Sequence, residues 1–118
     1  MKKMVGLIKG RHEMPVTDFI FNSIEDVLDF KSIRNGIVDF LNKEIGIKTV
    51  DGSAINQFDY TTVQILRGEN ELVVYITGLT PVVAELIRQC ALNGVSLTLM
   101  HYDREANAYV PQNIFWCS

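Results

Sequence analysis

The sequence is poor in cysteine and has no long apolar run. Its 118 residues include two cysteines, Cys90 and Cys117, which lie far apart along the chain. Two isolated thiols form neither a disulfide framework nor a zinc ligand set, so we expect Cys90 to be a small buried hydrophobic side chain. No apolar segment approaches the roughly 18 residues that a transmembrane helix needs. These deficits exclude a disulfide-stabilised scaffold and a membrane-spanning protein.

Positive charge is also in short supply. Eleven Lys and Arg residues stand against fourteen Asp and Glu residues, which gives a formal net charge of −3 at pH 7. A general nucleic-acid or anionic-membrane binder needs a basic face, so we expect neither a nucleic-acid duplex nor a membrane as a partner. A small anionic ligand remains open, because it needs only one or two local cations and a few backbone N–H groups.

The first nine residues contain an apolar stretch that is too short for a secretion signal. Lys9 interrupts it early, and no small-residue cleavage site follows. We therefore interpret the stretch as a strand and expect a cytoplasmic protein. With 47% apolar and 21% charged residues, the chain is expected to fold as a single domain over residues 1–118.

The first half of the chain predicts one strand and one helix. The strand covers residues 4–8, and residues 16–21 form either a short strand or an extended arm. Apolar residues recur at spacings of three to four between residues 30 and 45, which predicts an amphipathic helix. Asp29 is the expected N-cap of this helix, and Gly46 is the expected residue just beyond its end.

The middle of the chain predicts an antiparallel hairpin. Two strands, 60–66 and 71–76, are joined by residues 67–70, which are too few for a crossover. Residues 72–76 are continuously apolar, as in a central strand that is covered on both faces.

A second helix and two strands complete the pattern. Thr80 is the expected N-cap, Pro81 the first helical residue, and Gly94 the end of the helix. Strands follow at 95–102 and, after a turn, at 108–110. A strand, a helix of about three turns and a strand form a right-handed parallel unit.

The resulting order is β-α-β-β-α-β-β, which indicates an α/β (α+β) domain with a mixed sheet. The hairpin favours a ferredoxin-like arrangement with its helices on one face of the sheet. A Rossmann-like variant with one inserted hairpin is the alternative.

The turn from Thr77 to Pro81 is the first candidate binding site. It follows a buried strand and opens a helix whose first N–H groups lack intrahelical partners. Gly78 allows close approach of a ligand to the backbone, and the hydroxyls of Thr77 and Thr80 offer hydrogen bonds. The Walker pattern GxxxxGK[ST] is absent. The alternative is that these residues only cap the helix.

The loop Gly10-Arg11-His12-Glu13 is the second candidate. Arg11 can hold a phosphate with two hydrogen bonds, and His12 can act as a general acid or base. Glu13 can orient His12. If the first strand is parallel to the strand that ends at residue 76, this loop and the 77–80 turn lie at the same edge of the sheet. The alternative is a solvated loop.

The segment His101-Tyr102-Asp103-Arg104 is the third candidate. In an extended chain His101 and Asp103 lie on one side and Tyr102 on the other. We take His12 and His101 as the candidate catalytic pair, and Asp103 and Arg104 as candidate ligand contacts. No ligand spacing indicates a metal site, and no cofactor is predicted. A purely structural role for the segment is the alternative.

The C-terminal residues 114–118 are strongly apolar for a chain end. They either pack on the domain or cover a partner subunit. Because a chain of this size often extends its core by dimerising, we expect a homodimer.

The second half of the sequence resembles small CRISPR-accessory proteins of type III systems, which bind or cleave cyclic oligoadenylates. The run Leu72-Val73-Val74-Tyr75-Ile76-Thr77-Gly78-Leu79-Thr80-Pro81, the helix after it and the run from Leu99 to Val110 carry the resemblance. The shared layout is strand, Thr/Ser-Gly-x-x-Pro, helix, strand, Tyr-Asp turn and strand. The resemblance implies a ligand bound across the twofold axis of a dimer. A metal-dependent ring nuclease of this layout carries a histidine in the helix, whereas residues 82–93 contain none.

Three functions are therefore weighed. The first is a module of antiviral defence that binds a small anionic nucleotide, a cyclic oligoadenylate, through the 77–80 turn and Arg11. The second is a ring-nuclease-type phosphodiesterase in which His12 or His101 moves protons. The third is a non-enzymatic adaptor that uses an apolar surface.

Overall fold

A mixed sheet organises the chain. The computed structural model describes residues 2–10, 13–46 and 70–115. Within these ranges five strands form one sheet in the order β2-β1-β3-β4-β5. The strands are β1 (Lys2–Ile8), β2 (Phe19–Phe21), β3 (Glu71–Tyr75), β4 (Ser96–Asp103) and β5 (Ala108–Phe115). The helices are α1 (Phe30–Phe40), which continues into the π-helical turn η1 (Leu41–Ile45), and α3 (Thr80–Leu92).

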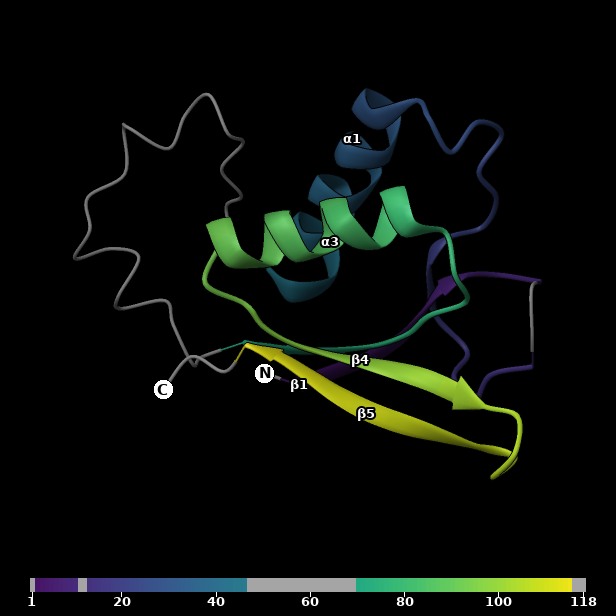
Figure 1. Ribbon diagram of the computed structural model, residues 1–118. Helices are drawn as coiled ribbons and strands as arrows, with labels where there is room; N and C mark the ends of the chain where they lie inside the picture. Colours follow the sequence, from purple (N-terminus) through teal and green to yellow (C-terminus); the bar gives the residue numbers. More distant parts are fainter. Residues whose placement is uncertain (1, 11–12, 47–69, 116–118) are drawn as a thin grey trace.

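Strands β2, β1, β3 and β4 are parallel, and β5 is antiparallel to β4. The chain advances from β1 to β3 past α1, and from β3 to β4 through α3, in the same direction across the sheet. Right-handed crossovers that advance in one direction place their helices on the same face. Figure 1 shows α1 and α3 together on one side of the sheet.

The mixed α/β domain predicted from the sequence is confirmed. Its parallel run fits the Rossmann-like alternative better than the ferredoxin-like one, although both helices cover one face. The short strand at the end of 16–21 is present as β2, and the final strand continues past residue 110 to Phe115. The predicted antiparallel hairpin is wrong for its second strand, because β3 pairs on both sides with parallel strands, β1 and β4. The predicted strand 60–66 itself lies outside the described residues, as do Arg11, His12 and Cys117.

Side chains from one face of the sheet and from both helices form the hydrophobic core. Alternate residues of β1, β3 and β4 face the helices because side chains alternate along a strand. The core residues are Val5, Leu7, Leu72, Val74, Leu97 and Leu99 in the sheet, Ile33, Ile37, Leu41 and Ile45 in the first helix, and Val82, Leu86 and Cys90 in the second. Cys90 is fully buried, as expected, and burial raises the pKa of its thiol to about 12.

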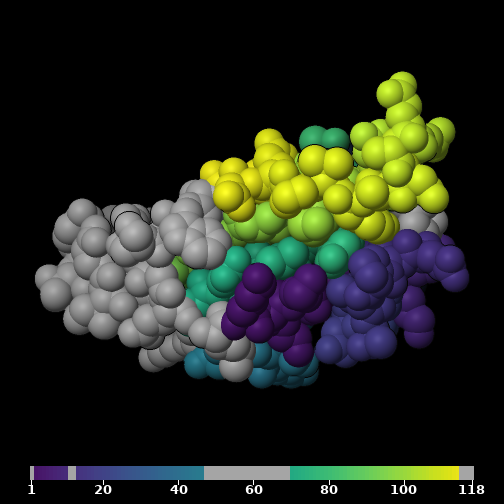
Figure 2. Space-filling model, turned by 90° about the horizontal axis from the view of Figure 1, so that it is seen from below, coloured from purple at the N-terminus to yellow at the C-terminus, as the bar shows by residue number. Residues whose placement is uncertain are grey.

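The opposite face of the sheet carries no layer of helices in the described part of the chain. Figure 2 views this face, on which β5, β4, β3, β1 and the segment after β1 follow one another. Tyr75 and Thr98 are nevertheless buried there. The ring of Tyr75 packs edge-on against Tyr109, with ring centres 4.8 Å apart, and Thr98 Oγ1 donates to Asn113 Oδ1 at 2.8 Å. Strand β3 is therefore central and covered on both faces, as predicted.

The first helix confirms the expected cap and adds a wider last turn. Asp29 accepts a hydrogen bond from the backbone N–H of Ser32, and Gly46 adopts a left-handed conformation with φ 76°. The core residues Ile37, Leu41 and Ile45 recur every four residues, slightly more than the about 3.6 residues of an α-helical turn. A straight α-helix would rotate Ile45 away from the core. The wider η1 turn keeps Ile45 buried.

The second helix starts at Thr80, one residue earlier than the predicted start at Pro81. Leu79, with φ 54° and ψ 60°, is the N-cap, and Thr80 is the first helical residue. The expectation that Thr80 caps the helix is wrong, because no side chain caps this end and the Leu79 carbonyl accepts from the N–H groups of Val82 and Val83. Gly94, with φ 68°, follows the last turn as predicted.

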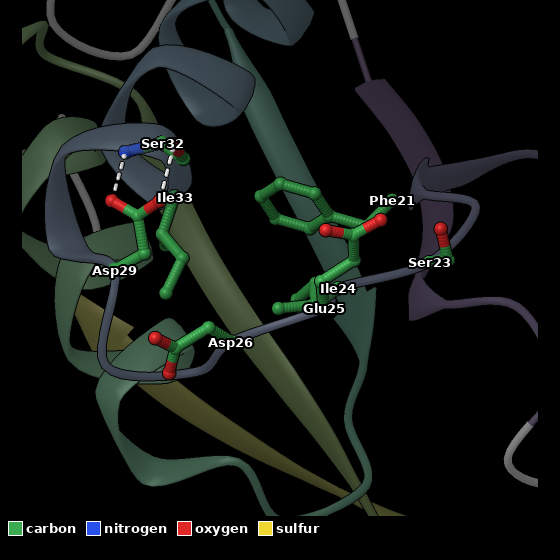
Figure 3. Close-up of a pocket in the computed structure, with 8 residues that line it drawn as sticks. All are labelled: Phe21, Ser23, Ile24, Glu25, Asp26, Asp29, Ser32 and Ile33. Atoms are coloured by element: carbon green, nitrogen blue, oxygen red, sulfur yellow. Dashed lines mark hydrogen bonds between the residues drawn. The ribbon is translucent and has the colours of Figure 1, made fainter.

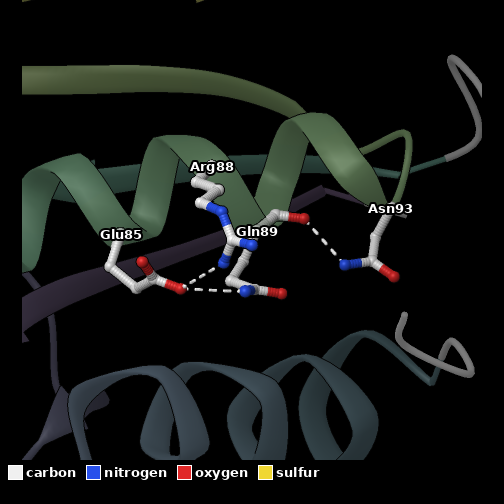
Figure 4. Close-up of polar contacts among 4 residues, drawn as sticks. All are labelled: Glu85, Arg88, Gln89 and Asn93. Carbon is white, nitrogen blue, oxygen red and sulfur yellow. Dashed lines mark hydrogen bonds and ion pairs between the residues drawn. The ribbon is translucent and has the colours of Figure 1, made fainter. Parts of the chain in front are cut away.

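A polar side chain lies buried between the two helices. Gln89 projects from α3 toward α1 and is fully buried (Figure 4). Its Nε2 donates to Glu85 Oε1 at 2.9 Å, and the same oxygen accepts from Arg88 at 3.1 Å. Its Oε1 accepts no hydrogen bond from the described part of the chain. A buried carboxamide oxygen without a donor destabilises the fold by about 1–3 kcal/mol.

No helix in the described ranges is long and apolar enough to cross a membrane.

Candidate functional site

The carboxyl ends of the parallel strands meet at one edge of the sheet. From β1 the chain continues to β2 on one side, and from β3 it continues to β4 on the other. Open α/β sheets bind ligands at the carboxyl edge, where successive connections diverge. In this protein the point of divergence lies between β1 and β3. It is flanked by Lys9 and Gly10 after β1 and by residues 76–79 after β3.

A hollow of about 230 Å³ lies beside this point and shares the turn after β3. Four of the predicted site residues line it, and two further residues complete the lining. They are Thr77, Gly78, His101 and Arg104, together with Ile76 and Tyr102. Residues predicted from two separate segments of the sequence are thus brought together by β3 and β4.

The turn after β3 places backbone N–H groups at the hollow. Gly78 has φ 73°, and a Cβ built on it would meet no atom within 4 Å. Leu79 adopts the left-handed conformation that non-glycine residues rarely take, and its half-buried side chain packs against the core. Within the described ranges, no backbone partner is found for the N–H of Gly78 or of Thr80. The turn therefore offers donors near the positive end of the α3 dipole.

His101 and Arg104 supply the side-chain chemistry of the hollow. The Nε2 atom of His101 lies 2.7 Å from Gln112 Oε1, and a proton on Nε2 is donated to that oxygen. This tautomer leaves Nδ1 as the acceptor. Arg104 is exposed and forms no ion pair with another described residue. None of the six described residues that line the hollow is acidic and Arg104 is cationic, which favours an anion there.

A second hollow, of about 280 Å³, adjoins the first and shares Tyr102 with it. It is lined by Glu13, Tyr102, Asn107 and Tyr109. The hydroxyl of Tyr102 donates to Asn107 Oδ1, and the hydroxyl of Tyr109 donates to the carbonyl of Glu13 at 3.2 Å. Desolvation by burial, followed by the neighbouring hydroxyls of Tyr102 and Tyr75, raises the pKa of Tyr109. We call these two hollows, which share Tyr102, the candidate groove, with a cationic end at Arg104 and an aromatic end at Tyr109.

Two predicted contacts do not line the groove. Thr80 is exposed at the start of α3, and Asp103 Oδ1 accepts from the N–H of Glu105 at 3.0 Å, which stabilises the turn between β4 and β5. Arg11 and His12 lie outside the described residues, so the proposed histidine pair stays a prediction. The aromatic end was not predicted. Its sequence signal is a pair of tyrosines, Tyr102 and Tyr109, on either side of a hairpin turn, which the register pairs directly.

In the described part of the chain, no three His, Cys, Asp or Glu side chains are grouped closely enough to hold a metal ion. Comparison of the chain with protein-family models, with curated proteins and with solved structures finds no match. The functional argument therefore depends on the chemistry of the groove.

Proposed function

We propose that this protein binds a small phosphate-bearing nucleotide at the carboxyl edge of its sheet. The observation that carries the proposal is the first hollow, in which the Gly78 turn, His101 and Arg104 line a space with no carboxylate among its described lining residues. Backbone N–H groups and a guanidinium are the donors that phosphate oxygens accept from most strongly. The volume of about 230 Å³ is below the roughly 300 Å³ of small-molecule pockets, and suits one phosphate group with its sugar.

The aromatic end of the groove supports a nucleotide rather than inorganic phosphate. Tyr102 is 42% exposed and stands between the two hollows. Its ring and that of Tyr109 lie with centres 5.4 Å apart, which limits their motion. An exposed and positioned aromatic ring beside a phosphate site provides a stacking surface for a base, worth roughly 1–3 kcal/mol per base.

We name a cyclic oligoadenylate as the first ligand to test, and antiviral defence in a type III CRISPR system as the setting. This choice depends on the resemblance of residues 72–112 to accessory proteins of such systems. A ring of nucleotides is larger than one groove, so two copies of the chain would share it. The homodimer is part of the same proposal.

Isothermal titration calorimetry tests the proposal. Cyclic tetra-adenylate, cyclic hexa-adenylate, AMP and pyrophosphate are each titrated into the full chain. We expect the cyclic ligands to bind at one ring per two chains, and Arg104→Ala to weaken binding by roughly tenfold, the effect of losing one charge-assisted contact of about 1.4 kcal/mol. Absence of heat with all four ligands at micromolar protein would reject the proposal.

A matched pair of glycine variants separates binding from folding. Gly78→Ala and Gly46→Ala each place a methyl group at a left-handed residue, with φ 73° and 76°, where a Cβ meets nothing within 4 Å. Both variants should lose similar stability, about 1 kcal/mol. Only Gly78→Ala should lower the affinity for the ligand, because Gly46 lies at the end of η1 and does not line the hollow. Equal affinity of the two variants would show that the turn after β3 does not contact the ligand.

A phosphodiesterase is the second candidate, and the position of His101 favours it. The imidazole lines the anion-favouring hollow, and Gln112 holds its Nε2. In this second candidate its other nitrogen accepts the proton of a ribose hydroxyl as that oxygen attacks the phosphorus, the phosphorus–oxygen bond to the next ribose breaks, and the departing oxygen takes a proton from water. Chromatography of the titrated cyclic ligand distinguishes the two functions. Linear product from wild type, and none from His101→Gln with unchanged affinity, would establish cleavage.

A further inference from the structure

A third hollow, of about 290 Å³, lies between the end of β2 and the first turn of α1. It combines apolar side chains with acidic and hydroxyl groups: Phe21, Ile24 and Ile33 on the one hand, and Ser23, Glu25, Asp26, Asp29 and Ser32 on the other. Figure 3 shows the Glu25 carboxylate beside the ring of Phe21, with Asp26 and Asp29 across the hollow from it. The space thus has an apolar interior and a rim of carboxylates.

Two large apolar side chains that neighbour a lining residue in the sequence are in contact with water. Leu28 is 64% exposed and Phe30 is 59% exposed, the largest fractions among the described large hydrophobic residues. They flank Asp29 in the sequence and lie at the start of α1. Exposed large apolar side chains on the segment that also lines a concave, partly apolar surface are typical of a docking site.

Only some of the carboxylate oxygens at this hollow accept hydrogen bonds that stabilise the fold. Asp29 accepts from the N–H and the hydroxyl of Ser32, and these bonds, followed by the charge of Lys31, lower the pKa of its carboxyl. Asp26 Oδ1 accepts from the N–H of Leu28 at 2.9 Å. Glu25 forms no ion pair with another described residue, and neither does Asp26. The capping bonds already offset the positive end of the helix dipole, so the remaining charge favours a cation.

We propose that this hollow docks a segment of a partner protein that presents an arginine or lysine next to a large apolar side chain. The cation lies between Glu25 and Asp26, where charge complementarity selects it. The apolar neighbour packs against Leu28 and Phe30. A metal ion alone fits less well, because it gains nothing from apolar surroundings and because one oxygen of Asp26 is held by the backbone. The proposal does not depend on nucleotide binding.

Selection from a random peptide library displayed on phage tests this proposal with the full-length protein. We expect the peptides enriched on wild type to share an Arg or Lys adjacent to Leu, Phe, Ile or Met. Enriched peptides without a basic residue, or no enrichment at all, would overturn the proposal. Enrichment of the same peptides on the double variant Glu25→Gln, Asp26→Asn would also overturn it, because both side chains keep their shape and lose their charge.

Fluorescence anisotropy with one enriched peptide then separates the two halves of the docking site. Glu25→Gln and Leu28→Ser should each lower the affinity for the peptide by roughly three- to tenfold. Asp39→Asn, which removes an exposed carboxylate from α1 outside the hollow, should leave the affinity unchanged. Higher salt should weaken peptide binding to the wild-type protein more than peptide binding to Glu25→Gln. An equal loss with Asp39→Asn would mean that net charge, and not this hollow, attracts the peptide.

Discussion

Replacing the buried Gln89 by methionine should stabilise the protein. The side chain is fully buried between α1 and α3, and its Oε1 accepts no hydrogen bond from a described residue (Figure 4). A buried polar atom without a partner costs about 1–3 kcal/mol, which Gln89→Met removes. Methionine has a similar length and a similar helix propensity, so it should leave no cavity and no strained turn.

The loss of one hydrogen bond opposes this gain. Gln89 Nε2 donates to Glu85 Oε1, but the Glu85 side chain is 17% exposed and keeps its contact with Arg88. Water and Arg88 therefore compensate much of the missing bond. We expect a net increase of about 1 kcal/mol in the free energy of unfolding, which corresponds to about 4 °C in the melting temperature of a domain of this size.

Urea denaturation followed by far-ultraviolet circular dichroism measures the effect. The midpoint should rise in Gln89→Met while the slope m stays constant. Gln89→Glu is the contrasting variant, because it keeps the size and places a carboxyl beside Glu85 in the interior. It should lower stability by about 3 kcal/mol or more at pH 7. A loss of more than about 1 kcal/mol in Gln89→Met would show that the carboxamide stabilises the helix pair and would refute the reasoning.

Two further predictions concern the core. Gly6→Ala should destabilise the protein by about 1–3 kcal/mol, because the new methyl group would lie 2.5 Å from the Phe19 ring and 2.9 Å from Met14 Sδ; denaturation of Gly6→Ala, Phe19→Leu should show partial recovery, and strictly additive losses would contradict the contact. Cys90 should resist thiol reagents in a Cys117→Ser background until the protein unfolds, since burial raises its pKa to about 12 from 9.0. Because the folded state holds this proton more tightly, its contribution to stability should decline as the pH rises from about 9 toward 12. Rapid labelling of Cys90 in the folded protein would count against its burial.

The sequence predicted the helices and most strands because their residues are constrained locally. The stripe of apolar residues in α1, its Asp29 cap and the glycines at 46 and 94 each encode a feature within a few positions. The first residue of α3 could not be predicted from local sequence alone. Thr80 has a side chain typical of an N-cap, yet the N-cap is Leu79. Leu79 packs against the core, and this contact holds its own backbone in the left-handed region. A tertiary contact decided between two local possibilities.

The pairing of the strands could not be predicted to the same extent, because it depends on contacts between distant segments. Strand β2 has only three residues, too few for its sequence to indicate which strand it pairs with. Its parallel alignment with β1 is seen only in the folded chain. For the same reason the sequence suggested two sheet arrangements. The observed order identifies the point where connections diverge, and that point could not be located without it.

The candidate groove shows both the strength and the limit of reading chemistry from residue types. Arg104, His101 and the Gly78 turn were predicted because a guanidinium, an imidazole and a strand-to-helix glycine each suggest phosphate chemistry by themselves. Tyr102 and Tyr109 suggest nothing by themselves, since tyrosines occur in many strands. Only the antiparallel register of β4 and β5 places their rings together and next to the cationic end. If a nucleotide binds, its phosphate should depend on residues that the sequence identified, and its base on residues that only the fold brings together. Tyr102→Leu should then weaken the binding of AMP and leave the binding of pyrophosphate unchanged. An equal effect on the affinity for both ligands would mean that the aromatic end does not hold the base.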